Sequence, residues 1–258
     1  MKKEEERFAA SDTFEGIVSI RSVIESMQNE KSGNDRRIVT CFYDESKRGT
    51  KEYAWLSHRA EELGFELRLC LRDEIDALCI GNTHGGIAAK CTERTIPPLT
   101  ADAVKKNGFY VMLEGIEDPY NFGYALRSLY SAGADGVILT ERNWFSAAGV
   151  VCRSSAGASE MLDVFRAEPA EAAGIMKAAG YKIVCADLRD SVPIYEADLS
   201  YPVFLAVGGE KRGISRALID LADARVRIEY GRDFAASLSA ASAATVVGYE
   251  IYRQNRGK

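Results

Sequence analysis

The chain has 258 residues, with 33 Lys and Arg against 38 Asp and Glu, and its hydrophobic content is 47%. These values are typical of a globular protein of two domains and exclude collagen-like, low-complexity and fully disordered chains. The net charge of −5 argues against a protein that coats nucleic acid non-specifically, although a local basic groove remains compatible with it.

The sequence contains neither a candidate membrane span nor the pattern of a metal-binding site. No segment reaches the roughly 18 consecutive apolar residues of a membrane span, and the charged start at Met1–Arg7 leads into no apolar run of a secretory signal. We therefore expect a cytoplasmic protein without membrane association. The six cysteines are far apart and there are only 2 histidines, so the clustered ligands of a zinc site are missing. We expect free thiols and no metal.

The first part of the chain alternates helix and strand patterns. Apolar residues at spacings of three and four predict a helix over 16–26, and a second helix over 50–63 ends at Gly64. Residues rich in β-branched and aromatic side chains predict strands over 37–42 and 65–71. This alternation predicts a small α/β sandwich over residues 1–97. Pro97 and Pro98 can continue neither a helix nor a central strand, so residues 98–107 are expected to form a linker.

The remaining residues, 108–258, repeat the alternation more strongly. Helices are expected between successive strands, which is typical of right-handed crossovers and a mostly parallel sheet. The predicted strands are 109–113, 136–139, 181–185, 203–207 and 225–228, and the predicted helices are 121–132, 169–179, 214–222 and 237–253.

Three segments of this second part contain candidate functional residues. In the first, a strand ends at Leu113, a turn follows, and a helix begins near Asn121 with Arg127 six residues later. Ligands in open α/β sheets collect at the carboxyl ends of strands. Taken alone, the segment is equally compatible with a helix cap at Asn121 and a surface arginine.

The other two segments combine small residues with turns. The strand 203–207 opens into Gly208-Gly209-Glu210-Lys211-Arg212-Gly213-Ile214, which is neither a GxGxxG fingerprint nor a Walker A loop. Glycines lack a Cβ and let a ligand approach the main chain. Residues 237–244 are a run of Ser, Leu and Ala that allows close helix packing. Each segment alone also suits an ordinary structural role.

The order of the three segments resembles a known family. Asn-x-Gly-x-x-x-Arg at 121–127, Gly-x-Glu-x-x-Gly-Ile at 208–214 and Ser-Leu-Ser at 237–239 are similar to the three motifs of the SpoU (TrmH) family, the AdoMet-dependent RNA 2′-O-ribose methyltransferases of the SPOUT class. Residues 153–158 and 83–88 resemble further segments of that family, the latter in its ribosomal-protein-like substrate domain. The resemblance spans about residues 15–253.

The resemblance implies a parallel SPOUT domain over 108–258 with a C-terminal trefoil knot that holds S-adenosyl-L-methionine. Cofactor contacts are implied at Gly208, Ile228 and Leu238, with Gly209, Gly213 and Ser237 shaping the walls. The catalytic residues implied are Arg127, Asn121, Glu210 and Ser239. Arg127 would act on the ribose 2′-hydroxyl either as a base or by fixing the flanking phosphate, and the second is physically easier because guanidinium seldom loses its proton. Ser239 stands where the family usually has Asn.

The same resemblance implies structured RNA, ribosomal or transfer, as substrate and a homodimer formed through the knotted domain. The 1–97 domain would recruit the RNA. Arg153, Lys211, Arg212 and Arg216 are candidates for a local basic groove, or else form a solvated charged face. The alternative function is an RNA-binding protein on the same fold with weak or lost methyl transfer, suggested by Ser239 and the acidic balance. A dinucleotide-dependent oxidoreductase is disfavoured because no GxGxxG follows an early strand.

Overall fold

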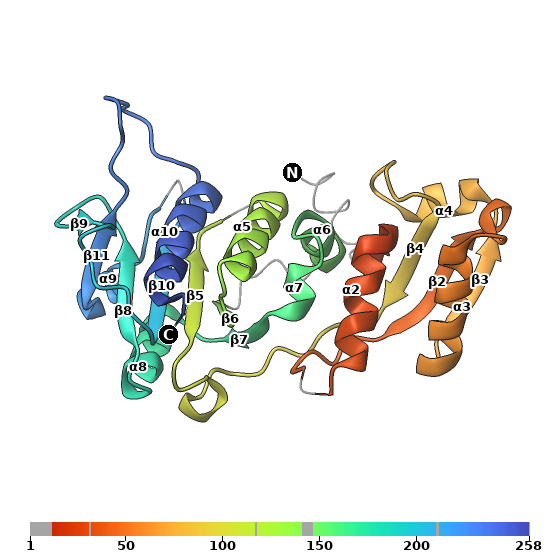
Figure 1. Ribbon diagram of the computed structural model, residues 1–258, viewed down its shortest axis with the longest axis horizontal. Helices are drawn as coiled ribbons and strands as arrows, with labels where there is room; N and C mark the ends of the chain where they lie inside the picture. The colour runs from red at the N-terminus through yellow and green to blue at the C-terminus, as the bar shows by residue number, and fades with distance from the viewer. Residues whose placement is uncertain (1–11, 31, 117, 141–146, 210–211, 258) are drawn as a thin grey trace. The chain divides into compact units, whose positions relative to one another are not determined.

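The computed structural model describes residues 12–30, 32–116, 118–140, 147–209 and 212–257. Its contacts divide the chain into two compact units. Unit 1 comprises Met1–Thr95 and Trp144–Met161, and unit 2 comprises Ile96–Asn143 and Leu162–Lys258 (Figure 1). Both units are built of helices and strands, which confirms the predicted α/β class. The trefoil knot stays a prediction.

Unit 1 contains a mixed four-stranded sheet in the order β1-β4-β2-β3. Strands β1 (Thr13–Glu15) and β2 (Ile38–Asp44) run antiparallel to β4 (Ile87–Cys91), and β3 (Glu66–Cys70) runs parallel to β2. The helical elements of this unit are α2 (Gly16–Gln28), η1 (Glu45–Lys47), α3 (Lys51–Leu63), α4 (Arg72–Leu78), α6 (Ala148–Ser154) and α7 (Ala158–Met161).

Helix α3 illustrates why the sequence was informative in this unit. The Thr50 side chain accepts a hydrogen bond from the backbone N–H of Tyr53, which caps the helix start. Gly64 ends the helix with φ +74°, a left-handed conformation that favours glycine. The predicted helix over 50–63 is therefore confirmed.

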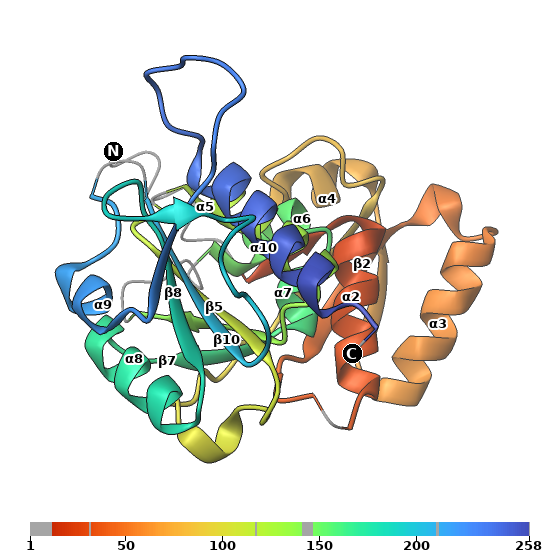
Figure 2. The ribbon, with the colours of Figure 1, turned by 60° about the vertical axis from the view of Figure 1, so that its left-hand side comes forward.

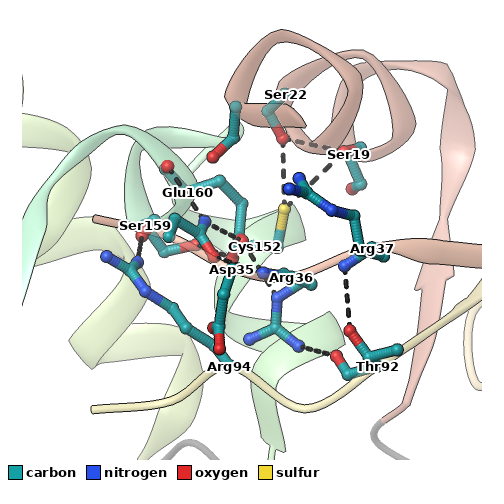
Figure 3. Close-up of polar contacts among 12 residues, drawn as sticks. Ser19, Ser22, Asp35, Arg36, Arg37, Thr92, Arg94, Cys152, Ser159 and Glu160 are labelled. Atoms are coloured by element: carbon teal, nitrogen blue, oxygen red, sulfur yellow. Dashed lines mark hydrogen bonds and ion pairs between the residues drawn. The ribbon is translucent and has the colours of Figure 1, made fainter. Parts of the chain in front are cut away.

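Helices α6 and α7 belong to unit 1 although they follow strand β6 of unit 2 in the chain. The Arg36 guanidinium lies 3.0 Å from the Glu160 carboxylate of α7, and their side chains are 3% and 1% exposed (Figure 3). Arg36 also donates to the Thr92 carbonyl, and Arg94 donates to the Ser159 carbonyl. Cys152 of α6 lies 3.4 Å from the Ser22 hydroxyl. The sequence pattern predicts a second domain that includes residues 144–161, whereas the contacts of these residues place them in unit 1.

Unit 2 contains a seven-stranded sheet in the order β7-β6-β5-β10-β8-β11-β9, and every adjacent pair is parallel. The parallel sheet predicted for this part is confirmed. The central strands are apolar on both faces and buried, as expected when helices cover a parallel sheet. The strands are β5 (Phe109–Glu114), β6 (Gly136–Leu139), β7 (Asp163–Arg166), β8 (Lys182–Ala186), β9 (Val192–Pro193), β10 (Val203–Gly208) and β11 (Ala224–Arg227).

The helical elements of unit 2 are η2 (Ala101–Ala103), α5 (Pro119–Ser131), α8 (Pro169–Ala178), α9 (Arg216–Leu221) and α10 (Ala240–Asn255). Helices α5 and α10 lie side by side (Figure 2). A Cβ on Gly248 would lie 3.1 Å from Leu129 Cδ2, so the small residues of α10 serve this close contact. Residues 98–107, predicted as a linker, pack on this unit: Leu99 is buried in its core, and its N–H donates to the Arg166 carbonyl.

The described part of the chain contains no helix long and apolar enough to cross a membrane. All six cysteines are free thiols. Burial raises the pKa of Cys152 and of Cys185 to about 12, so both thiols are protonated at neutral pH.

Candidate active site

A cavity of about 230 Å³ lies where strands β8, β10 and β11 end. In a parallel sheet the carboxyl ends of neighbouring strands meet at one edge, which is where such folds bind ligands. The cavity is lined by Ala186, Asp187, Leu188, Val207, Gly208, Gly209, Gly213, Ile214, Val226, Arg227, Ile228, Tyr230, Ser237, Leu238, Ala240 and Ala243. The lining includes all six residues that the family resemblance assigns to the cofactor site, three as contacts and three as walls: Gly208, Ile228 and Leu238, and Gly209, Gly213 and Ser237.

The glycines of this wall allow the backbone to fold back on itself. A Cβ on Gly208 would lie 2.2 Å from the carbonyl carbon of Gly213, and one on Gly209 would lie 2.2 Å from the Gly115 carbonyl oxygen. The Gly213 N–H donates to the Gly209 carbonyl at 2.9 Å, and Gly213 has φ +65°. The glycine-rich pattern predicts that a ligand approaches the main chain here. The structure shows a more direct reason for the glycines, because neighbouring main chain already occupies the space that a Cβ needs.

The opposite wall is formed by the start of α10 and the segment before it. The N–H of Leu238 donates to the Tyr230 hydroxyl at 3.0 Å, which joins this segment to the residues that follow β11. Ser239 caps α10, since its hydroxyl accepts a hydrogen bond from the Ser242 N–H at 3.2 Å. Ser239 does not line the cavity, and its observed contacts are those of a helix cap.

Asp187 is a residue of the cavity that the sequence analysis missed. It directly follows β8, and its carboxylate accepts a hydrogen bond from the Arg189 N–H at 3.2 Å. A carboxylate at this place can accept hydrogen bonds from hydroxyl groups or attract a cationic ligand. The available signal was a polar residue two positions after the predicted strand 181–185. A similar signal, polar residues after a predicted strand, drew attention to the segment that follows Leu113.

Asn121 and Arg127 both lie on α5, with exposed side chains, and neither lines the cavity. The Asp118 carboxylate caps this helix by accepting a hydrogen bond from the Tyr120 N–H at 2.7 Å. The helix therefore begins at Pro119, two residues before the predicted start, and Asn121 is not its cap. Within the described residues the Arg127 guanidinium has no hydrogen-bonding partner. Glu210, expected to orient it, lies outside the described residues.

Two of the four cations predicted for a basic groove, Arg153 and Arg216, form ion pairs within their own units. Arg153 of unit 1 pairs with the buried Glu15 carboxylate and the Thr83 hydroxyl of the same unit. Arg216 pairs with Asp220 one helical turn later, at 2.9 Å on the surface of α9. Arg212 is exposed, and Lys211 lies outside the described residues. Of the four predicted cations, Arg212 lies in the glycine-rich loop 208–214 and Arg216 lies two residues after it.

The model of the SpoU rRNA methylase family matches residues 108–249. The chain belongs to this family. A TrmH-family tRNA/rRNA methyltransferase of Staphylococcus saprophyticus is 30% identical over 189 residues, which cover 71% of this chain and 75% of that protein.

Solved structures of the SpoU family share the fold. AviRb, a SpoU methyltransferase from Streptomyces viridochromogenes solved with the cofactor AdoMet, matches with a TM-score of 0.78 and 25% identity, over 94% of this chain and 89% of that one. An AdoMet-bound rRNA methyltransferase from Sinorhizobium meliloti matches with a TM-score of 0.76 and 24% identity, over 98% and 90% of the two chains. The α/β architecture described above is thus that of SpoU methyltransferases.

Proposed function

We propose that this SpoU-family protein transfers a methyl group from S-adenosyl-L-methionine to a ribose 2′-hydroxyl of structured RNA, ribosomal or transfer. The observation that carries the proposal is the cavity at the ends of β8, β10 and β11, whose walls contain all six residues that the family resemblance assigns to the cofactor. The crystal structure of AviRb with AdoMet, on the same fold, supports this choice of ligand. AdoMet supplies the methyl group on a sulfonium, and the protein supplies orientation.

The cavity walls suit such a ligand. Gly208, Ile228 and Leu238 offer main-chain groups and apolar surface to an adenosine. Asp187 adds a carboxylate that can bind ribose hydroxyls or face the positive charge of the sulfonium. The mixture of apolar walls and a few polar groups is typical of small-molecule sites.

Arg127 is the proposed catalytic residue. A ribose 2′-hydroxyl is a weak nucleophile and loses its proton as the new C–O bond forms. A guanidinium that grips the flanking phosphate holds the hydroxyl in place and stabilises its developing negative charge. Asn121, one and two-thirds turns earlier on α5, is proposed to assist in this positioning, together with Glu210. Ser239 is proposed to act by fixing the start of α10.

The Arg127 assignment is tested by separating binding from transfer. We expect Arg127→Ala to keep the AdoMet affinity in calorimetry and to lower methyl transfer by about a hundredfold, since one transition-state contact is lost. Arg127→Lys keeps the positive charge but not the bidentate geometry of the guanidinium, so its methyl-transfer rate should lie between those of the wild type and Arg127→Ala. Unchanged turnover of Arg127→Ala would contradict the assignment.

The methylated nucleotide is identified by a separate experiment. Mapping 2′-O-methyl sites in RNA from cells that lack the protein, against RNA from wild-type cells, would show which site is lost.

We further propose that the protein acts as a homodimer through unit 2 and that unit 1 recruits the RNA. The outer face of α10 carries Tyr249 and Tyr252, which are 46% and 44% exposed, and the adjacent α5 carries the exposed Tyr124 and Tyr130. Exposed aromatic side chains gathered on two neighbouring helices are typical of an interface. Sedimentation of the wild type and of Tyr249→Glu tests this: the wild type should sediment as a dimer and the variant as a monomer.

The second candidate is an RNA-binding protein of the same fold without methyl transfer. It is favoured by one observation, the serine at position 239, which caps α10 where the family usually has Asn. Calorimetry separates the two candidates. Micromolar AdoMet binding supports the enzyme, and no binding at millimolar AdoMet supports the second candidate.

A further inference from the structure

The segment between β11 and α10 projects from unit 2 as a long loop (Figures 1 and 2). Residues 229–237 are all exposed. Two aromatic side chains lie on this loop, Tyr230 and Phe234, which are 37% and 61% exposed. A single exposed aromatic residue needs no explanation, but two on one loop beside a cavity point to an interaction.

The two rings form one wall of a second hollow. Their centroids lie 6.2 Å apart with the planes tilted by 52°. The hollow has a volume of about 440 Å³ and is lined by Glu229, Tyr230, Gly231, Arg232, Phe234 and Leu238. Tyr230 and Leu238 also line the cavity assigned to the cofactor. The two cavities are therefore neighbours that share a wall, and this wall is held by the hydrogen bond from the Leu238 N–H to the Tyr230 hydroxyl.

The chemistry of the second hollow suits a flat, unsaturated ring. Its walls offer the two aromatic side chains and the Arg232 guanidinium, which makes no ion pair with a described residue. Proteins that bind unpaired RNA stack its bases on aromatic rings and on arginine planes. Guanidinium adds attraction for the neighbouring phosphate.

We propose that Phe234, Tyr230 and Arg232 hold one unpaired base of the RNA substrate next to the methyl-donor cavity. The proposal rests on the function proposed above and deepens it, because it assigns the target region to a nucleotide whose base is unstacked. Phe234 supplies the free stacking face, while Tyr230, anchored through its hydroxyl, separates the base from the cofactor. The loop thereby contributes to the choice of nucleotide.

Base stacking is tested directly in the full-length Phe234→Trp variant. A tryptophan at this position reports stacking through quenching of its fluorescence. We expect an octamer of riboadenylate to quench the added fluorescence, relative to the wild type, and an octamer of abasic ribose phosphate to leave it unchanged. Equal quenching by both octamers, or by neither, would overturn the proposal.

The contribution to the reaction is tested with Phe234→Ala. We expect the KM for RNA to rise about tenfold, since one stacking contact is lost, while the AdoMet affinity stays within twofold. Tyr195→Ala is the matched control, because Tyr195 is also 61% exposed in unit 2 but lines neither cavity. An equal KM in Phe234→Ala and Tyr195→Ala would overturn the proposal.

Failure of this proposal is distinguishable from failure of the proposed function. A wild type that binds AdoMet and methylates RNA, with no base-dependent quenching in Phe234→Trp, overturns the stacking role alone. If the wild type does not bind AdoMet but Phe234→Trp shows base-dependent quenching, the proposed methyltransferase function is overturned and the stacking role is supported.

Discussion

Units 1 and 2 each hold together parts of the chain that are far apart in sequence, and they do so by opposite means. In unit 1, charged side chains join residues more than one hundred positions apart: Glu160 accepts from Arg36 at 3.0 Å and from Asn34 at 2.8 Å. In unit 2, glycines let main chain meet main chain, as where a Cβ on Gly209 would lie 2.2 Å from the Gly115 carbonyl oxygen.

The difference has consequences for how each region fails. A buried ion pair is broken by removing an atom group, because its partner then stays buried and uncompensated. A main-chain contact between glycines is broken by adding a methyl group, because close-packed backbone cannot move aside cheaply. Unit 1 should therefore be sensitive to deletion of charge, and the cavity of unit 2 to gain of volume.

The largest effect is expected for Glu160→Ala. The Arg36 guanidinium, whose side chain is 3% exposed, would lose its anionic partner. We expect the free energy of unfolding to fall by about 3–5 kcal/mol in urea unfolding of the full chain. Replacing both partners by apolar residues, in Glu160→Leu with Arg36→Met, should recover much of this loss, since no charge is then left buried.

The control for charge deletion is Asp220→Ala. Asp220 pairs with Arg216 on the surface of α9, where the two side chains are 54% and 87% exposed. Such exposed pairs contribute less than about 0.5 kcal/mol. A loss for Asp220→Ala as large as that for Glu160→Ala would show that burial does not determine the effect.

Gain of volume is tested with Gly208→Ala. The added Cβ would lie 2.2 Å from the Gly213 carbonyl carbon and 2.4 Å from the Ile214 nitrogen, so the loop must open. We expect a loss of about 1–3 kcal/mol in unfolding free energy and an AdoMet Kd raised by about a hundredfold. Calorimetry and urea unfolding measure both.

Gly174→Ala is the matched control for this substitution. Gly174 lies exposed on α8, and a Cβ there meets nothing within 4 Å. Alanine in a helix is favoured over glycine by roughly 0.5–1 kcal/mol, so this variant should be stabilised and bind AdoMet as the wild type does. If Gly208→Ala behaved in the same way, the close approach of main chain would not shape the cavity.

The two kinds of contact also differ in how far the sequence predicts them. The strand 203–207 and its glycine-rich loop can be recognised in the sequence, because a local pattern of apolar residues and glycines specifies them. The order of the three motifs indicates the family, and all six residues that the family resemblance assigns to the cofactor site line one cavity. The role of Glu160 was not predicted. Its partners lie 124 and 126 residues away, and no periodicity in 158–161 indicates that its carboxylate is buried. The same reason explains why residues 144–161 were assigned to the second domain.

A smaller effect is expected at the start of α10, where one side chain caps a helix. Ser239→Ala removes the acceptor for the Ser242 N–H and should lower the free energy of unfolding by about 1 kcal/mol. Ser239→Asn should keep the stability, because Asn caps a helix as well as Ser does. Equal stability of Ser239→Ala and the wild type would contradict the capping role. The rate of Ser239→Asn then shows directly whether the asparagine usual in the family increases methyl transfer.

The smallest effect is expected for Glu250→Gln, which tests a half-exposed pair of unit 2 against the buried pair of unit 1. Hydrogen bonds from Arg253 and Gln254 hold the pKa of the Glu250 carboxyl below its ordinary value. A carboxyl whose pKa is lowered by folding stabilises the protein above its unfolded pKa, and this contribution is lost as the pH falls through the folded value. Because the Arg253 side chain is 61% exposed, we expect a loss of about 0.5 kcal/mol at pH 7 and a smaller loss at acidic pH, where the carboxyl becomes protonated. Urea unfolding measures both, with Glu61→Gln as the control, since Glu61 is exposed and makes no ion pair with a described residue. A loss of the same size at neutral and acidic pH would mean that the charge of Glu250 does not explain the effect of the substitution. The Glu250–Arg253 pair could then not be compared with the buried Arg36–Glu160 pair as an ion pair.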